Sequence, residues 1–229
     1  MIRFAVVVGL CGGLFAGLLT AAAAAQVPAP ENYGQAMDWY GRAAEAGNAR
    51  AQFYLGVMME TGVRGAPDVS AAAGWYEKAA RQGHVDAQFK LGLLYYEGRG
   101  VTRDRAAAAG WYAKAAEGGS AEAQYNLALM AERGVGMARD SARAARFFEK
   151  AADGGLARAA LGLSALYAKG EGVERDPVRA LMWLEVAAAG GLGGFEGFRE
   201  GLAAGMQAAD IEKAKAMARR HLGGTAGGG

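Results

Sequence analysis

Residues 71–104 read AAAGWYEKAARQGHVDAQFKLGLLYYEGRGVTRD, and the pattern of this stretch recurs along most of the chain. Its aromatic residue returns every 36 positions, at Trp39, Trp75, Trp111, Phe147 and Trp183. An Ala pair (Ala79-Ala80), a Gly (Gly83) and an Asp (Asp104) return at the same spacing. A period of this length is typical of solenoids, in which each unit buries its apolar face against the next. The sequence therefore predicts a stack of repeats.

Each repeat is predicted to form two helices. Asp104 can cap a first helix, which runs through Trp111 to Gly119, since a Gly readily adopts the left-handed conformation that ends a helix. The second helix begins near Ser120 and ends at Gly134. The fold class that follows is all-α, an α/α superhelical solenoid of 36-residue helix-turn-helix repeats.

The second helix of each repeat has one buried face. In the first repeat Gln52, Leu55, Gly56 and Met59 are spaced so that they share a face. Gly56 and its equivalent Gly92 stand inside helices, where a Gly costs about 1 kcal/mol relative to Ala. We therefore expect each to admit an aromatic side chain from a neighbouring helix.

The composition fits this fold and excludes several classes of protein. The 229 residues include 37 Gly, are rich in Ala, and are 52% hydrophobic and 21% charged. Ala is the strongest helix former, whereas strands favour β-branched and aromatic residues, and a disordered chain is less apolar. A net charge of +2 gives no basic surface for nucleic acid or for an acidic membrane.

The N-terminus is predicted to be an export signal over residues 1–25. Arg3 precedes an apolar run at 4–19, and Ala23 and Ala25 satisfy the small-residue rule for cleavage after Ala25. The alternative is that the segment is retained as a membrane anchor. Cleavage would remove Cys11, the single cysteine, and would leave a periplasmic or secreted chain that contacts the membrane only through the signal before cleavage.

The rest of the chain divides into four parts. Residues 26–34 are expected to form an extended leader, and 35–200 the solenoid, with four full repeats and a partial fifth. Residues 201–222 are expected to form a C-terminal capping helix, because a solenoid needs a polar cover at its end. Residues 223–229 are expected to be a disordered tail.

The repeat closely resembles the Sel1-like repeat, a relative of the tetratricopeptide repeat. The stretch from Ala71 to Asp104 displays nearly the whole motif, and the resemblance covers about Gln35 to Gly191. It implies a superhelix that acts as an adaptor or scaffold for other proteins, and an exported bacterial member of the family. Some secreted members carry many disulfides and bind or hydrolyse β-lactams, but the mature chain has no cysteine.

By the same resemblance, the second helix of each repeat lines a concave groove that binds a protein partner. The residues expected to face this groove are Arg50, Phe53, Val57, Glu60, Asp86, Phe89, Leu93, Tyr96, Glu122, Tyr125, Leu129, Glu132 and Arg158. Rigid rings beside varied charges suit peptide recognition. The alternative is that Phe53, Phe89 and Tyr125 pack between neighbouring helices, as aromatic stripes at helical spacing commonly do.

The opposite side is expected to carry a ladder of basic residues. Arg42, Lys78, Lys114 and Lys150 recur at the repeat spacing. A solvated helical surface commonly has this pattern, and the alternative is a site for anions.

The sequence contains no arrangement that predicts catalysis, a metal site or a cofactor. His84 and His221 have no companion ligands at metal-binding spacing. The serines lie outside the motifs of known nucleophiles. We therefore expect a monomeric, non-enzymatic scaffold, with two alternatives: a regulator that binds the periplasmic domain of a sensor kinase, and a hydrolase of β-lactams or peptidoglycan.

Overall fold

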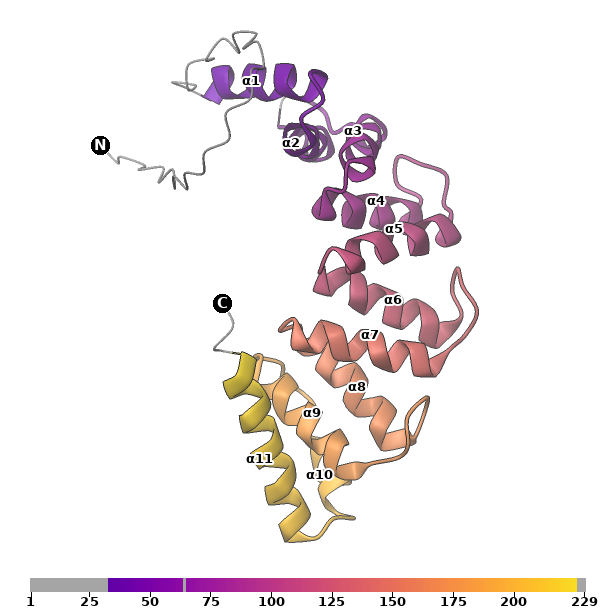
Figure 1. The fold of residues 1–229 in the computed structure, drawn as a ribbon, viewed down its shortest axis with the longest axis vertical. Helices are drawn as coiled ribbons and strands as arrows, with labels where there is room; N and C mark the ends of the chain where they lie inside the picture. Colours follow the sequence, from indigo (N-terminus) through magenta and orange to yellow (C-terminus); the bar gives the residue numbers. More distant parts are fainter. Residues whose placement is uncertain (1–32, 64, 226–229) are drawn as a thin grey trace, which may run out of the picture.

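The computed structural model describes residues 33–63 and 65–225, which form a curved stack of α-helices (Figure 1). The predicted signal peptide, most of the predicted leader and the last four residues lie outside this part. The helices are α1 (Tyr33–Glu45), α2 (Ala49–Thr61), α3 (Val69–Arg81), α4 (Val85–Glu97), α5 (Arg105–Glu117), α6 (Ala121–Arg133), α7 (Ser141–Asp153), α8 (Ala157–Lys169), α9 (Pro177–Ala189), α10 (Glu196–Ala203) and α11 (Ala208–Thr225). The predicted all-α solenoid is confirmed.

Local hydrogen bonds set the ends of these helices, as the sequence predicts. The Asp104 carboxylate accepts from the amides of Ala106 and Ala107 at the start of α5, at 3.0 and 2.9 Å. Just beyond α5, Gly119 has a φ of 92°, and Gly134 after α6 has a φ of 70°. Few residues other than Gly adopt this left-handed conformation without strain. The repeat therefore carries its own start and stop signals.

The interior glycines admit buried rings, also as predicted. A Cβ at Gly56 of α2 would lie 2.7 Å from the Tyr76 ring, and one at Gly92 of α4 would lie 2.8 Å from Tyr112. Both tyrosines are almost fully buried. The rings therefore fix how closely α3 approaches α2 and how closely α5 approaches α4.

The C-terminal cap differs from the predicted helix at 201–222. Two helices occur, α10 and α11, separated by a turn at 204–207 that contains Gly205. Helix α11 runs to Thr225, so residues 223–225, predicted as tail, are helical. Ala214 and Ala218 of α11 are buried in the same core cluster as the residues of α9. Small residues therefore let α11 lie close against α9 and cover the end of the stack.

Candidate functional site

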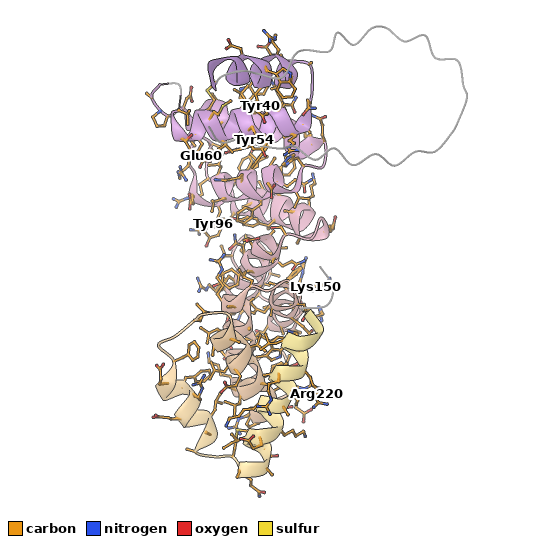
Figure 2. The ribbon with its side chains drawn as sticks, turned by 90° about the vertical axis from the view of Figure 1, so that its left-hand side faces the viewer. Tyr40, Tyr54, Glu60, Tyr96, Lys150 and Arg220 are labelled. Atoms are coloured by element: carbon orange, nitrogen blue, oxygen red, sulfur yellow. The ribbon has the colours of Figure 1, made fainter. Side chains whose placement is uncertain are left out.

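The two helices of each repeat present different faces to solvent. We call the outward residues of α2, α4, α6 and α8 the Gln-Leu face, and those of α3, α5, α7 and α9 the Trp-Tyr face. In Figure 2, Glu60 of α2 and Tyr96 of α4 lie on one flank of the stack, and Lys150 of α7 lies on the other. The candidate binding residues all belong to the Gln-Leu face. That this face is concave stays a prediction.

The aromatic column of the Gln-Leu face packs onto the core. Each ring contacts the buried ring of the following helix, with centroids 5.7 to 5.8 Å apart, in the pairs Phe53–Tyr76, Phe89–Tyr112 and Tyr125–Phe148. The three outer rings are half-buried, so they lie between neighbouring helices. This is the packing alternative that the sequence left open, and it makes the column part of the scaffold that supports the surface.

Glu60 is engaged inside the protein rather than free for a partner. Its side chain is only 11% exposed, accepts from the Tyr76 hydroxyl at 2.7 Å and pairs with Lys90 at 3.1 Å and Arg99 at 3.4 Å. Burial raises the pKa of this carboxyl, but the hydrogen bonds from Tyr76 and Lys90 and the two positive charges outweigh it and hold the pKa below its ordinary value. Burial and the same carboxylate raise the pKa of Tyr76. The group of Glu60, Tyr76, Lys90 and Arg99 is called the Glu60 cluster below.

Several candidate residues remain available to solvent. Arg50, Asp86, Glu122 and Arg158 are exposed, and Tyr96 and Glu132 are half-buried. The Arg158 guanidinium lies 4.8 Å from the centre of the Tyr125 ring, and Arg50 lies 5.7 Å from that of Tyr54. These positions can present charge to a partner without disturbing the core.

The α4–α6 junction contains a pocket of about 140 Å³. It is lined by Leu93, Tyr96, Glu97, Tyr112, Asn126, Leu129 and Met130. Apolar side chains dominate, and the Asn amide and the tyrosines supply polar groups. Burial raises the pKa of the Tyr112 phenol, and its side-chain hydrogen bond with Asn126 offsets part of this rise. We call this the junction pocket.

The sequence missed most of the residues that line this pocket. Of the residues predicted to face the groove, Leu93, Tyr96 and Leu129 line it, whereas Glu97, Tyr112, Asn126 and Met130 were not predicted. Lys90 of the Glu60 cluster and Asn126 of the junction pocket occupy the same repeat position, which holds Tyr54 in the first repeat and Gly162 in the fourth. This change of residue type at one position of a regular repeat is the sequence feature that could have indicated a difference between the junctions.

The Trp-Tyr face stacks its lysines on its tryptophans. The Lys78 ammonium lies 3.7 Å from the centre of the Trp75 ring, and that of Lys114 lies 4.1 Å from that of Trp111. Cation–π contact of this kind holds a lysine against the surface. Two of the four residues of the predicted basic ladder, Lys78 and Lys114, are thus in contact with the protein's own tryptophan rings.

The two histidines have structural surroundings. His84 caps α4 through Nδ1 and stacks on Phe53 at 4.7 Å, and His221 meets the edge of Trp183 at 4.8 Å. Within residues 33–63 and 65–225, no group of three His, Cys, Asp or Glu side chains could hold a metal ion. No helix of the described part has the length and apolar character needed to cross a membrane.

Comparison with known families identifies the repeat. The family model described as Sel1 repeat matches residues 25–48, 49–84, 85–120, 121–156 and 157–192. No curated protein matches the chain.

The chain is also similar to solved structures, and the first of those below supports the same fold. A Sel1 repeat protein from Oxalobacter formigenes is 29% identical, with a TM-score of 0.69 over 83% of this chain and 79% of that one. A protective antigen of uropathogenic Escherichia coli with an SLR fold is 28% identical, with a TM-score of 0.48 over 85% of this chain and 50% of that one. An immunity protein from Pseudomonas aeruginosa is 18% identical, with a TM-score of 0.44 over 84% of this chain and 61% of that one.

Proposed function

Because the chain belongs to the Sel1 repeat family, we propose that it is a scaffold that binds a segment of a partner protein on its Gln-Leu face. Sel1 repeat solenoids are commonly protein–protein interaction scaffolds and are generally non-catalytic. The periplasm is proposed as the compartment, on the strength of the signal pattern at residues 1–25.

The observation that carries this proposal is the combination of features on one face. The Gln-Leu face has the junction pocket, exposed charges such as Asp86 and Glu122, and half-buried rings that hold its shape. Binding sites on proteins are typically apolar hollows with a few well-placed polar groups, and a rigid surface loses little entropy on binding. On the Trp-Tyr face, by contrast, two lysines lie over the tryptophan rings that would offer apolar contact.

Site-specific photo-crosslinking in intact cells tests the proposal. The photoreactive residue p-benzoylphenylalanine replaces Asp86 or Glu122, which are exposed and outside the core, and replaces Gly74 of α3 as the control on the Trp-Tyr face. We expect one protein to be captured from the first two positions and not from Gly74. Capture from Gly74 alone, or from none of the three, would contradict the proposal.

Mass spectrometry of the captured protein then separates the remaining alternatives. A sensor kinase would identify this chain as a regulator, and an envelope assembly protein would identify it as an assembly scaffold. Substituting Phe89 and Tyr125 is a poorer test, because both rings contact buried rings and their loss would also weaken the fold.

A further inference from the structure

Three successive junctions of the solenoid carry different side chains at the same two repeat positions. The first junction joins α2 to α4 and has Glu60 and Lys90. The second joins α4 to α6 and has Tyr96 and Asn126. The third joins α6 to α8 and has Glu132 and Gly162. Each pair stands beside the buried ring of the helix between them, so the three junctions can be compared directly.

The first and third junctions are filled by the protein itself. At the first, Lys90 reaches Glu60 at 3.1 Å and the Tyr76 hydroxyl donates to the same carboxylate oxygen. At the third, a Cβ on Gly162 would lie 2.8 Å from the Phe148 ring, so this ring lies directly against α8. In both cases the protein's own atoms lie against the central ring.

The second junction is left open. Asn126 is shorter than Lys90, and Tyr96 lies 5.7 Å from the Arg105 guanidinium instead of joining an ion pair across the junction. The junction pocket of about 140 Å³ remains. An engineered apolar cavity of about 150 Å³ holds a benzene molecule, so the size suits one aromatic or branched aliphatic side chain.

Acidic groups lie on the two helices that supply most of this pocket, α4 and α6. Glu97 lines the pocket and pairs with Arg99 at 3.3 Å, and Asp86, Glu122 and Glu132 stand elsewhere on the same two helices. Within the described part of the chain, no ion pair engages Asp86, Glu122 or Glu132. Lys90 of α4, by contrast, forms an ion pair with Glu60. The three carboxylates without an ion pair, Asp86, Glu122 and Glu132, therefore favour positive charge on an incoming chain that lies along α4 and α6.

We infer that the junction pocket receives one apolar side chain of the partner segment, an aromatic or branched aliphatic residue flanked by lysines or arginines. This inference rests on the proposed function and specifies which residue of the partner enters the protein. The pocket supplies apolar burial for the anchor, and the carboxylates select the residues on either side of it.

Short peptides of defined sequence test this directly. The probes are acetyl-Lys-Lys-Phe-Lys-Lys-amide, the same peptide with Ala at the centre, and the same peptide with Glu in place of every Lys. Binding is followed by the NMR methyl signals of Leu93, Leu129 and Met130 at millimolar peptide concentration. Full burial of an aromatic side chain corresponds to about tenfold to a hundredfold in affinity, so the Phe peptide should bind at least about tenfold more tightly than the Ala peptide.

The pocket can be filled with a pair of residues that the protein already uses at its first junction. Tyr96→Glu with Asn126→Lys copies the Glu60 and Lys90 pair into the second junction, and thermal melting checks that the variant is folded. Asn126→Met fills the same space without charge and serves if the graft does not fold. Gly110→Ala of α5 is the matched control, because its Cβ would meet open space on the other face.

We expect the Phe peptide to bind the pocket-filled variant at least about tenfold more weakly than the wild-type protein, and to bind the Gly110→Ala variant as tightly as the wild type. Equal binding of the Phe and Ala peptides, preference for the Glu peptide, unchanged binding to the filled variant, or no methyl shift at all would each overturn it. The proposed function has a separate test, since the photo-crosslinks from Asp86 and Glu122 do not depend on the pocket. Persistence of those crosslinks in the filled variant would show that the partner binds the face without the anchor.

Discussion

At the scale of single residues, the repeat matches each buried ring with a small residue on the helix that it contacts. Tyr76 faces Gly56, Tyr112 faces Gly92, and the Phe148 ring lies against Gly162. The first two pairs follow from the 36-residue period. The third does not, because Gly162 stands at a different repeat position from Gly56 and Gly92. The glycine that makes room for a buried ring can thus lie on the helix before the ring or on the helix after it.

The glycine pairing predicts opposite effects for two Gly→Ala substitutions. At Gly92 the added methyl group meets the buried Tyr112 ring at 2.8 Å, and overpacking of this kind costs about 1–3 kcal/mol. At Gly110 of α5 the methyl group meets open space, and Ala should stabilise the helix by about 0.5–1 kcal/mol. Urea denaturation of both variants measures the two changes. A Gly92→Ala variant more stable than wild type would contradict the packing argument.

The Glu60 cluster predicts a pH dependence of stability. The pKa of Glu60 is held below its ordinary value, so its ionised form stabilises the fold above about pH 4.5, and this contribution is lost as the pH falls through the folded-state pKa. Glu60→Gln should therefore destabilise the protein by about 1–2 kcal/mol at pH 7 and by less at pH 3.5.

Thermal melting at the two pH values measures this difference. Glu122→Gln is the matched control, because Glu122 is exposed and belongs to no such cluster. A destabilisation by Glu60→Gln that is as large at pH 3.5 as at pH 7 would rule out the assigned role of the charge.

At the scale of helices, the sequence predicted the elements closely because helix ends depend on local chemistry. The helix predicted between Ser120 and Gly134 is α6, Ala121–Arg133, with Ser120 capping it at 3.2 Å. The C-terminal prediction was less accurate, since it took 201–222 as one helix. Residues outside the repeat have no period to set their boundaries, and the contact of α11 with α9 is tertiary.

Helix α11 is predicted to be the cover of Trp183. This side chain is 5% exposed, whereas Trp75 and Trp111 are half-buried, and the edge of its ring meets His221 of α11. Ala218→Asp places an unpaired charge in the α9–α11 contact, which should cost about 3 kcal/mol or more and expose Trp183 to solvent.

The indole N–H signal of Trp183 in NMR spectra reports this exposure through faster exchange with water. Arg219→Asp is the control at the neighbouring, exposed position, and should change stability by no more than about 0.5 kcal/mol. If Ala218→Asp left the Trp183 signal and the melting temperature unchanged, α11 would not be a cap.

At the scale of the whole molecule, the two ends of the stack are unequal. The core of the described part consists of four clusters, and the largest runs from α6 to α11. The smallest lies between α1 and α2, where Tyr40 is only half-buried although the equivalent Tyr76 and Tyr112 are almost fully buried. Along the arc in Figure 1, the smallest of these clusters therefore lies at the α1 end and the largest at the α11 end.

This asymmetry predicts a gradient of local stability. Repeats contact only their neighbours, so the unit with the smallest core should open most often. Hydrogen exchange measured by mass spectrometry should show the fastest exchange in α1 and α2 and the slowest in α7, α8 and α9. Uniform protection along the chain would instead indicate a single cooperative unit.

Less of the candidate site than of the fold could be predicted from the sequence. The period placed the site residues on one set of helices, and two of them, Glu60 and Tyr96, lie on the same flank of the stack in Figure 2. The period could not show that Glu60 is hydrogen-bonded to Tyr76 and Lys90, which lie 16 and 30 residues away in the chain. Nor could it reveal the junction pocket, because a cavity depends on the lengths of side chains that meet only in the folded stack.

The sealed α9–α11 end also limits how copies of the protein can associate. A helical repeat stack with two open ends can accept another copy at each end, and such head-to-tail contacts grow into filaments unless the rotation between copies closes a ring. Helix α11 lies over Trp183 and Val186, so the protein itself covers these two apolar side chains, and they are not presented to the α1 end of a second molecule. One terminal helix thus removes one of the two end surfaces through which helical repeats can stack.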